Sequence, residues 1–440
     1  MKKILLPLLI ASSLLKSQTS INVFSQIVFY DGYAANVSQP VPANTLRLAN
    51  SRYARKLTDT ELNSFQNKIQ MNVTIGALCD NYDRIGGVHI ALVPKGQASY
   101  TMNDPQVKRI EVGRYITPFM NKNISPTEVP YTYEVNNLYA VFSNTALRAV
   151  YDIWVELDVF GVPYAANTQV AGCANRNDVF AGTLTFVTSN DPAVTNTFNS
   201  LLPLLDSNTL NNYNNTDVAG QTVRLVNFSL TQTASNASFF IVTTPHGAGT
   251  NGEEYVRRQN FVSLDNTQML NFFPGGKSCE PYRMYNTQGN GIYGSTPKTT
   301  LWWTSWNNWC PGDAVPIRSF SVPSLSAGSH TLKYEVPDAG FYNQDGQVVL
   351  SIYMQGHSQN LSVKDISTVD VSIFPNPTAD YVMIRGQKKV KQISVFTMDG
   401  RKLSETNGPK ADLTAYPAGT YLLDILLEGN TRFTHKVMKK

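Results

Sequence analysis

The stretch Ala149-Val150-Tyr151-Asp152-Ile153-Trp154-Val155 carries the pattern that decides the fold of this chain. Apolar side chains come in short runs broken by single polar ones, and β-branched and aromatic residues dominate, which is typical of a β-strand. The same pattern recurs at Gln26-Ile27-Val28-Phe29-Tyr30 and at His89-Ile90-Ala91-Leu92-Val93. Gly, Pro, Asn and Asp punctuate these runs, without long stretches of helical period. The sequence therefore predicts an all-β fold of sandwiches or barrels. One helical turn is expected at Thr58-Asp59-Thr60-Glu61-Leu62, where a Thr cap has a Glu nearby.

The order of polar and strand-like stretches predicts the domains. A length of 440 residues suggests several domains, at about 100–200 residues each. A polar, Asn-rich stretch after residue 170 favours a boundary there, and strand patterns then resume and continue to Met354. The polar stretch 356–367 is typical of a linker. We predict an N-terminal domain, a central domain, the linker and a C-terminal domain at 19–170, 171–355, 356–367 and 368–440.

The first residues are typical of a secretory signal peptide. Met1-Lys2-Lys3 is positively charged, an apolar run from Ile4 to Ala11 follows, and small or polar residues come after it. We predict a signal peptide over residues 1–18, because the run is too short to span a bilayer. No other apolar run approaches the roughly 18 residues of a membrane helix, so no transmembrane segment is expected.

Charge and metal-ligand patterns exclude several function classes. The formal net charge of +4 is spread without a strong run, so the sequence does not indicate nucleic-acid binding. The five histidines are scattered, and neither H-E-x-x-H nor C-x-x-C occurs. We therefore expect no metal and no cofactor. Four cysteines in an exported chain permit two disulfides.

The C-terminal domain carries a set of ordered motifs. Phe374-Pro375-Asn376-Pro377 opens it, Asp399-Gly400-Arg401 lies in the middle, and Ala418-Gly419-Thr420-Tyr421 precedes a closing Lys436. Alternating strands with tight Pro-Asn-Pro and Asp-Gly turns predict a small antiparallel, immunoglobulin-like β-sandwich. The motifs resemble those of the C-terminal sorting domain of the type IX secretion system of Bacteroidetes. This resemblance implies the type IX machinery as a partner, and export through the periplasm and outer membrane to the cell surface or medium.

Four clusters could carry chemistry. Leu301–Gly312 holds four of the five tryptophans, which suit either a sugar ring or a sandwich core. Cys79–Arg84 and Gly252–Arg258 each place acidic residues beside arginine, and Tyr151–Trp154 places Asp beside aromatic residues. A single carboxylate beside arginine is usually a surface ion pair, so each cluster alone is a weak indication of a site.

Taken in order, the clusters resemble a known family. C-D-x-Y-D-R from Cys79, G-R-Y-I-T-P-F from Gly113, Y-D-I-W from Tyr151, E-Y-x-x-R from Glu254 and W-C-P-G-D-A-V-P-x-R from Trp309 are similar to motifs of peptide-N-glycosidase F. The resemblance implies two adjacent eight-stranded antiparallel jelly-roll sandwiches with the site between them. It also implies hydrolysis of the amide between asparagine and the innermost N-acetylglucosamine, with an N-glycoprotein or glycopeptide as substrate.

The same resemblance implies roles for individual residues. The catalytic set comprises Asp83 as the main acid/base group, Glu254 as its partner and Asp152 as the holder of a sugar hydroxyl, with Glu253 left open as an alternative to Glu254. The arginines implied to donate to the substrate are Arg84 and Arg258. The aromatic residues implied to pack on sugars are Tyr82, Trp154, Tyr255 and Trp309.

The chain also departs from the family pattern. Trp306 stands where the family has a substrate-site arginine, and Asp152 where it has a glutamate. Cys279 and Cys310 form the implied disulfide. Cys79 lacks the family's partner, and its pairing with Cys173 is left open. These departures leave open a non-catalytic glycan-binding surface protein, and a structural adhesin is a further alternative. A copper monooxygenase and a serine hydrolase are disfavoured, because the chain lacks clustered histidines and a G-x-S-x-G motif. We expect a monomer.

Overall fold

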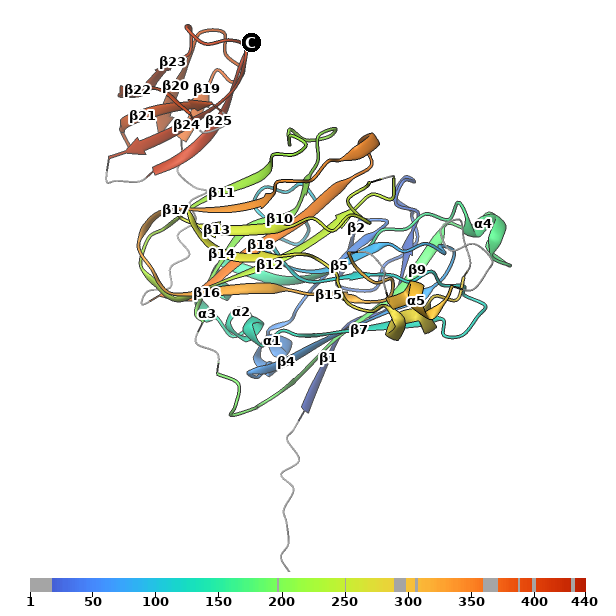
Figure 1. Ribbon diagram of the computed structural model, residues 1–440. Coiled ribbons are helices and arrows are strands. Elements are labelled where there is room, and N and C mark those ends of the chain that lie inside the picture. Colours follow the sequence, from blue (N-terminus) through green and yellow to red (C-terminus); the bar gives the residue numbers. More distant parts are fainter. Residues whose placement is uncertain are drawn as a thin grey trace, which may run out of the picture. The chain divides into compact units, whose positions relative to one another are not determined.

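The computed structural model describes residues 18–195, 198–249, 251–288, 298–304, 308–358, 371–386, 388–397, 401–428 and 432–440. The chain divides into two compact units, Met1–Leu361 and Ser362–Lys440, and β-strands dominate both (Figure 1). The all-β prediction is therefore confirmed. The predicted signal peptide, apart from Gln18, and residues 359–367 of the predicted linker lie outside the described residues.

The first sandwich of the larger unit is built from two antiparallel sheets. The four-stranded sheet has the order β1 (Gln18–Tyr30), β9 (Asp178–Ser189), β4 (Lys68–Ala77), β7 (Glu128–Glu134). The six-stranded sheet has the order β15 (Ala314–Val315), β6 (Lys108–Ile116), β5 (Ile85–Pro94), β8 (Tyr151–Val159), β3 (Arg52–Lys56), β2 (Thr45–Ala49). Aromatic pairs join the sheets, with ring centroids 5.3 Å apart for Phe29–Tyr53 and 4.5 Å apart for Tyr115–Tyr131.

The second sandwich has eight strands in two sheets. One sheet has the order β10 (Ser200–Leu210), β18 (Gln347–His357), β12 (Ala234–His246), β16 (Arg318–Leu325). The other has the order β11 (Thr222–Leu230), β17 (Gly328–Val336), β13 (Asn260–Leu264), β14 (Thr267–Phe272). The buried core between them includes Phe239, Leu332 and Ile352.

Short helices lie in the connections. They are α1 (Asp59–Ser64), α2 (Tyr139–Phe142), α3 (Thr145–Val150), α4 (Ala166–Gln169) and α5 (Thr300–Thr304), with 3₁₀ turns η1 (Asn136–Leu138), η2 (Glu280–Tyr285) and η3 (Tyr342–Gln344). The predicted helical turn is confirmed as α1, because Thr58 caps it and Glu61 completes the capping box. The strand expected from Ala149 begins at Tyr151 instead, since Ala149 and Val150 form the end of α3, whose N-cap is Asn144.

The predicted boundary at residue 170 falls too early. Strand β9 follows it, yet β9 pairs with β1 and β4 and so belongs to the first sandwich. The polar stretch that suggested a boundary is a loop of the first sandwich, held by a disulfide at Cys173. The chain passes from the first sandwich to the second between β9 and β10.

The two sandwiches of the larger unit are joined through β6. Strand β15, from the second half of the chain, pairs with β6 at Tyr115 and Arg114. The buried Arg114 guanidinium forms an ion pair with Glu111 at 2.6 Å and donates to Thr244 Oγ1 at 2.8 Å and to the Val349 carbonyl at 2.7 Å. A buried cation with all these partners is costly to separate from them, so β6 fixes how the halves meet.

The smaller unit is a separate antiparallel sandwich. Its sheets have the orders β19 (Val371–Phe374), β20 (Tyr381–Gly386), β23 (Lys410–Asp412) and β22 (Lys402–Asn407), β21 (Val390–Thr397), β24 (Gly419–Leu427), β25 (Arg432–Lys439). Its core includes Val382, Ile393 and Leu423. The predicted Asp399-Gly400 turn lies outside the described residues.

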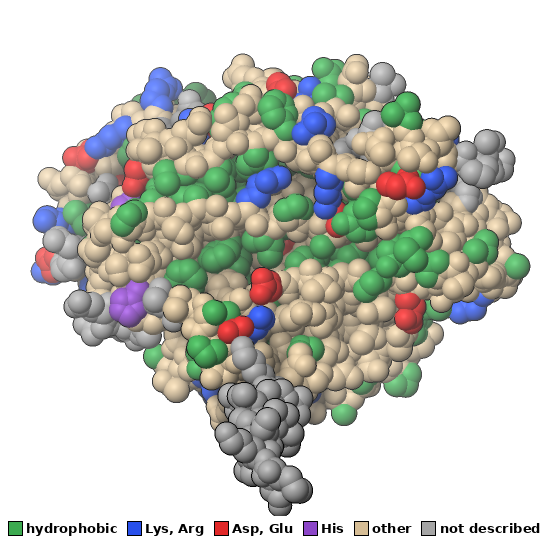
Figure 2. Space-filling view, turned by 60° about the horizontal axis from the view of Figure 1, so that its bottom comes forward, with side chains coloured by type: hydrophobic (Ala, Val, Ile, Leu, Met, Phe, Trp, Pro, Cys, Tyr) green, Lys and Arg blue, Asp and Glu red, His purple; other side chains and the backbone are tan. Residues whose placement is uncertain are grey.

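Two properties of the described residues bear on partners. None of their helices combines the length and the hydropathy needed to cross a membrane. On the face shown in Figure 2, acidic and basic side chains are interspersed among the residues that the structure describes, without a broad field of one sign.

Candidate active site

Asp83 lies on the loop between β4 and β5, and a buried carboxylate organises this loop. Asp80 is only 1% exposed. It accepts hydrogen bonds from the Tyr82 backbone N–H at 2.9 Å, from Arg84 Nε at 2.6 Å and from the Val162 backbone N–H at 2.7 Å. A buried carboxylate that lost these donors would be left unsatisfied at a cost of about 1–3 kcal/mol or more. The loop is therefore held in one arrangement.

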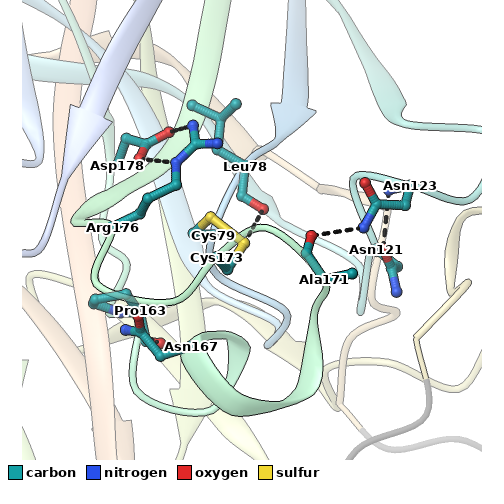
Figure 3. The surroundings of a disulfide bond; sticks show 10 residues. All are labelled: Leu78, Cys79, Asn121, Asn123, Pro163, Asn167, Ala171, Cys173, Arg176 and Asp178. Atoms are coloured by element: carbon teal, nitrogen blue, oxygen red, sulfur yellow. Dashed lines mark hydrogen bonds and ion pairs between the residues drawn. A yellow bond between two sulfur atoms is a disulfide. The ribbon is translucent and has the colours of Figure 1, made fainter.

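A disulfide anchors the start of the same loop (Figure 3). Cys79 is bonded to Cys173, which lies 94 residues further along the chain, and both cysteines are fully buried. The Cys79–Cys173 pairing, which the sequence left open, is thus present in the structure. The bond ties the Asp83 loop to the loop that contains α4.

Thr117 clamps the chain on both sides of Asp83. Its hydroxyl accepts the Arg84 backbone N–H at 2.8 Å and donates to the Tyr82 carbonyl at 3.2 Å. Its own backbone N–H donates to the Arg84 carbonyl at 2.8 Å. Thr117 is fully buried, so the Asp83 side chain is presented from a fixed backbone.

Glu254 lies on the loop between β12 and β13, and Asn308 holds that loop from inside. The Asn308 amide donates to the carbonyls of Glu253 at 2.7 Å, Glu254 at 2.9 Å and Val256 at 3.1 Å. The Glu254 Oε2 accepts the Gly247 backbone N–H at 3.3 Å. Asn308 and Gly247 therefore set the position of Glu254.

The two adjacent glutamates point to different partners. Glu253 is fully buried and accepts hydrogen bonds from Arg258 Nε at 3.1 Å and from the backbone N–H groups of Gly340 at 2.8 Å and Phe341 at 3.2 Å. Glu253 thus stabilises its loop and occupies Arg258. Of the two glutamates, Glu254 is the one that interacts with Asp83.

The carboxyl groups of Asp83 and Glu254, from opposite sandwiches, influence each other electrostatically. Burial and the charge of Glu254 raise the pKa of Asp83 well above its usual value, although Arg84 opposes the shift. The Asp83 Oδ2 is buried and has no hydrogen-bond partner among the described residues. Burial raises the pKa of Glu254 to about 7, although Gly247 and the Tyr255 hydroxyl act against the shift. Both carboxyl groups therefore have raised pKa values, which suits acid/base chemistry.

Three further predicted residues lie beside this pair. Tyr255, which is 40% exposed, has its hydroxyl hydrogen-bonded to Glu254. Arg84 stays next to Asp83, with its guanidinium carbon 5.3 Å from the Tyr82 ring centroid. Burial and both carboxylates raise the pKa of Tyr255, so its hydroxyl stays protonated.

The structure does not bring Asp152 to this site. Asp152 pairs with Val93 across β8 and β5, eight residues along β5 from Ile85. At about 3.3 Å per residue that separation is roughly 25 Å. The Asp152 carboxylate forms ion pairs with Lys56 at 2.6 Å and Lys95 at 2.9 Å, at the edge of a separate pocket of about 320 Å³.

Most of the tryptophans are part of the packing. Trp154 is buried against Tyr100, with ring centroids 5.5 Å apart. Trp303 is buried against the Cys279–Cys310 disulfide, whose implied pairing is confirmed. Trp309 is 7% exposed and its Nε1 donates to the Pro245 carbonyl at 3.0 Å. The expectation that Trp154 and Trp309 present their faces to sugars therefore fails, and Trp306 lies outside the described residues.

Sequence reasoning missed the residues that position the pair. Asp80 and Thr117 stand inside quoted motifs, and Asn308 directly precedes Trp309. Short polar side chains at such places commonly bind nearby backbone groups, which was the available signal. A pocket of about 60 Å³ is lined by Asn308 and Trp309 but by neither carboxyl group of the pair.

One group of described residues has metal-ligand types. His89, Glu111 and Asp206 bring ligand atoms within 4.8 Å of one another. However, the His89 Nδ1 lies 2.9 Å from Asp206 and its Nε2 lies 3.1 Å from Asp158. Burial lowers the pKa of His89, but these carboxylates raise it to about 9. A charged imidazolium is a poor ligand, so this cluster acts as an ion network between the sandwiches.

Fold and site define the class: an all-β protein of two joined sandwiches with an acid pair contributed by both. Residues 20–175 match the model of the peptide-N-glycosidase F N-terminal domain, and residues 212–355 match that of its C-terminal domain. The chain belongs to the peptide-N-glycosidase F family. Residues 372–440 match a secretion system C-terminal sorting domain, so the smaller unit is a type IX sorting domain and the protein is exported.

Solved structures share the fold. Two crystal structures of PNGF-II give TM-scores of 0.55 and 0.56 at 18% identity, covering 78% of this chain and 66% of that chain. A peptide-N(4)-(N-acetyl-β-D-glucosaminyl)asparagine amidase gives a TM-score of 0.51 at 14% identity, covering 79% of this chain and 98% of that one. The chain thus spans slightly less than two thirds of PNGF-II. No curated protein matches its sequence.

Proposed function

We propose that the protein hydrolyses the amide bond between asparagine and the innermost N-acetylglucosamine of N-glycoproteins or glycopeptides. The observation that supports the proposal is the pair Asp83 and Glu254, whose carboxyl groups come from different sandwiches and both have raised pKa values. Family membership supports the choice of substrate class.

Amide hydrolysis needs an activated water and a proton for the departing nitrogen. In the proposed mechanism Asp83, whose pKa is raised, acts as the acid and donates a proton to that nitrogen. The ionised partner, Glu254, takes a proton from the water whose oxygen attacks the side-chain carbonyl carbon. The carbon–nitrogen bond breaks, leaving aspartate in the peptide and a glycosylamine. Acid/base assistance of this kind contributes about 10²–10⁴-fold in rate.

The neighbouring groups have supporting roles in this proposal. The Tyr255 hydroxyl orients Glu254. Arg84 is held in place by its hydrogen bond to Asp80 and provides a positive charge next to Asp83. The partly exposed Tyr82 and Tyr255 are the aromatic groups available to the first sugar.

A glycopeptide with one N-glycan provides the test. Cleavage releases the glycan and leaves a peptide about one dalton heavier than its asparagine form, because the amide has become an acid. We expect Asp83→Asn to reduce kcat at least about 100-fold without lowering the melting temperature. Asp59→Asn, at a carboxylate that is 76% exposed, is the matched control.

A glycan-binding protein without turnover is the second candidate. The observation that favours it is the position of Asp152 and the burial of Trp154, which remove two groups that the family resemblance implied for the site. Wild-type protein that retains the glycopeptide in a binding assay but leaves its mass unchanged would establish this second function and refute the first.

A further inference from the structure

Three aromatic side chains form a surface patch near the candidate site, and we call Tyr33, Phe160 and Tyr164 the aromatic shelf. Tyr33 and Tyr164 are 71% and 61% exposed, and their rings are nearly parallel, with centroids 6.4 Å apart and an interplanar angle of 17°. Phe160 packs against Tyr33 in an edge-to-face arrangement, with ring centroids 5.1 Å apart. Exposed aromatic residues in a cluster commonly mark a binding surface.

The backbone holds the shelf in place. A Cβ atom at Gly32 would lie 2.5 Å from Phe160 Cε2, so only glycine permits this packing. The Gly32 N–H donates to the Gly161 carbonyl at 2.9 Å, and the Asn50 amide donates to the Asp31 carbonyl at 2.8 Å. The exposed Tyr33 thus stands on a braced loop, which lowers the entropy cost of binding on it.

The shelf is continuous with the Asp83 loop. The Arg84 guanidinium carbon lies 6.0 Å from the Phe160 ring centroid and 5.3 Å from that of Tyr82. Asp80 binds both Arg84 and the Val162 N–H, which lies between Phe160 and Tyr164 in sequence. The Cys79–Cys173 disulfide joins the same two loops (Figure 3). A ligand anchored at Asp83 can therefore extend onto the shelf.

We propose that the aromatic shelf binds sugar residues of the N-glycan beyond the innermost N-acetylglucosamine. This inference rests on the proposed function. The three shelf side chains are uncharged, and two carry a hydroxyl at the end of a flat apolar ring, which suits the apolar face and hydroxyl rim of a neutral pyranose. Arg84, which lies beside Phe160, is already paired with Asp80, so the shelf does not favour an acidic peptide.

Kinetics on two substrates test the proposal. They share one peptide and carry either a complete mannose-containing N-glycan or the innermost N-acetylglucosamine alone. The variant Tyr33→Ala/Tyr164→Ala should raise KM about 10-fold to 100-fold for the complete glycan, because each ring contact is worth roughly a factor of ten or less. Its kcat on that substrate, and both constants on the short substrate, should stay as in the wild type. Tyr33→Phe/Tyr164→Phe, which keeps the rings, should retain most of the affinity.

A binding measurement separates this proposal from the proposed function. Free mannose-containing N-glycan oligosaccharide is titrated calorimetrically into the full chain, which needs no turnover. Weaker binding in the alanine variant supports the shelf even if the protein is not an amidase. Equal binding in wild type and variant, or equal KM changes on both substrates, would overturn the proposal, and the latter result would assign the shelf to the peptide.

Discussion

Replacing Asn308 with alanine tests whether one side chain fixes the loop that carries Glu254. The Asn308 amide donates to three carbonyls at 2.7, 2.9 and 3.1 Å. Its two hydrogens correspond to about two hydrogen bonds of roughly 1 kcal/mol each, and the Glu253 and Val256 carbonyls, which lose this donor, raise the total loss to about 2–4 kcal/mol.

The expected loss of stability is measurable as a shift in melting temperature. The unfolding entropy is about 2.1 cal/mol/K per residue, so a unit of roughly 340 residues has about 0.7 kcal/mol/K and Tm should fall by about 3–6 °C. Scanning calorimetry on the full chain gives this shift. The kcat for glycopeptide cleavage should also fall, since the loop would no longer hold Glu254 in the position where it influences Asp83.

Asn271→Ala is the matched control for this experiment. Asn271 is exposed and accepts a hydrogen bond from Gln259 at 2.6 Å, so its loss should cost at most about 0.5 kcal/mol. If Asn308→Ala melted within about one degree of the wild type, or no lower than this control, the assigned role of Asn308 would be refuted.

Three further changes have expected outcomes. Burial raises the pKa of Glu254 from 4.5 to about 7, so its stabilising contribution is full below about pH 4.5 and is lost as pH rises through 7. Glu254→Gln should therefore be more stable than the wild type at pH 8, by on the order of 3 kcal/mol, and equally stable at pH 4, while cleavage is abolished at both; a stability difference independent of pH would contradict this. Cys79→Ser/Cys173→Ser opens a loop of 94 residues and should cost about 3–5 kcal/mol by the chain-entropy model and lower kcat; unchanged melting would count against the anchoring role. Asp152→Asn removes two lysine ion pairs and should lower Tm slightly but leave glycopeptide cleavage intact, whereas loss of cleavage with an intact fold would return Asp152 to the site.

Several features were predictable because they depend on local sequence. Alternating apolar residues predicted the strands, Thr58 and Glu61 predicted the capped helix α1, and the Phe374–Pro377 motif predicted the sorting domain. Asp83 and Glu254 came from the family resemblance, and the charge of Glu254 raises the pKa of Asp83. These inferences hold because short motifs carry their own geometry.

The misplaced features depend on long-range pairing. The prediction that Asp152 lies in the candidate site was wrong because the strand register places Asp152 opposite Val93. A short motif does not fix strand register. The predicted domain boundary at residue 170 was wrong because a polar loop that is held by a disulfide looks like an interdomain segment in the sequence. Burial of Trp154 and Trp309 could not be foreseen, since the same ring serves a core or a ligand equally well.

The two-residue strand β15 has a consequence for how the protein is made. Residues Ala314–Val315 complete a sheet whose other strands all precede β9 in the chain. As the first sandwich folds, β6 therefore lacks this partner until Ala314–Val315, more than a hundred residues after β9, is in place. An open strand margin invites association with other chains. A truncated first sandwich expressed without residue 315 would thus be prone to aggregate, and the two halves must mature together.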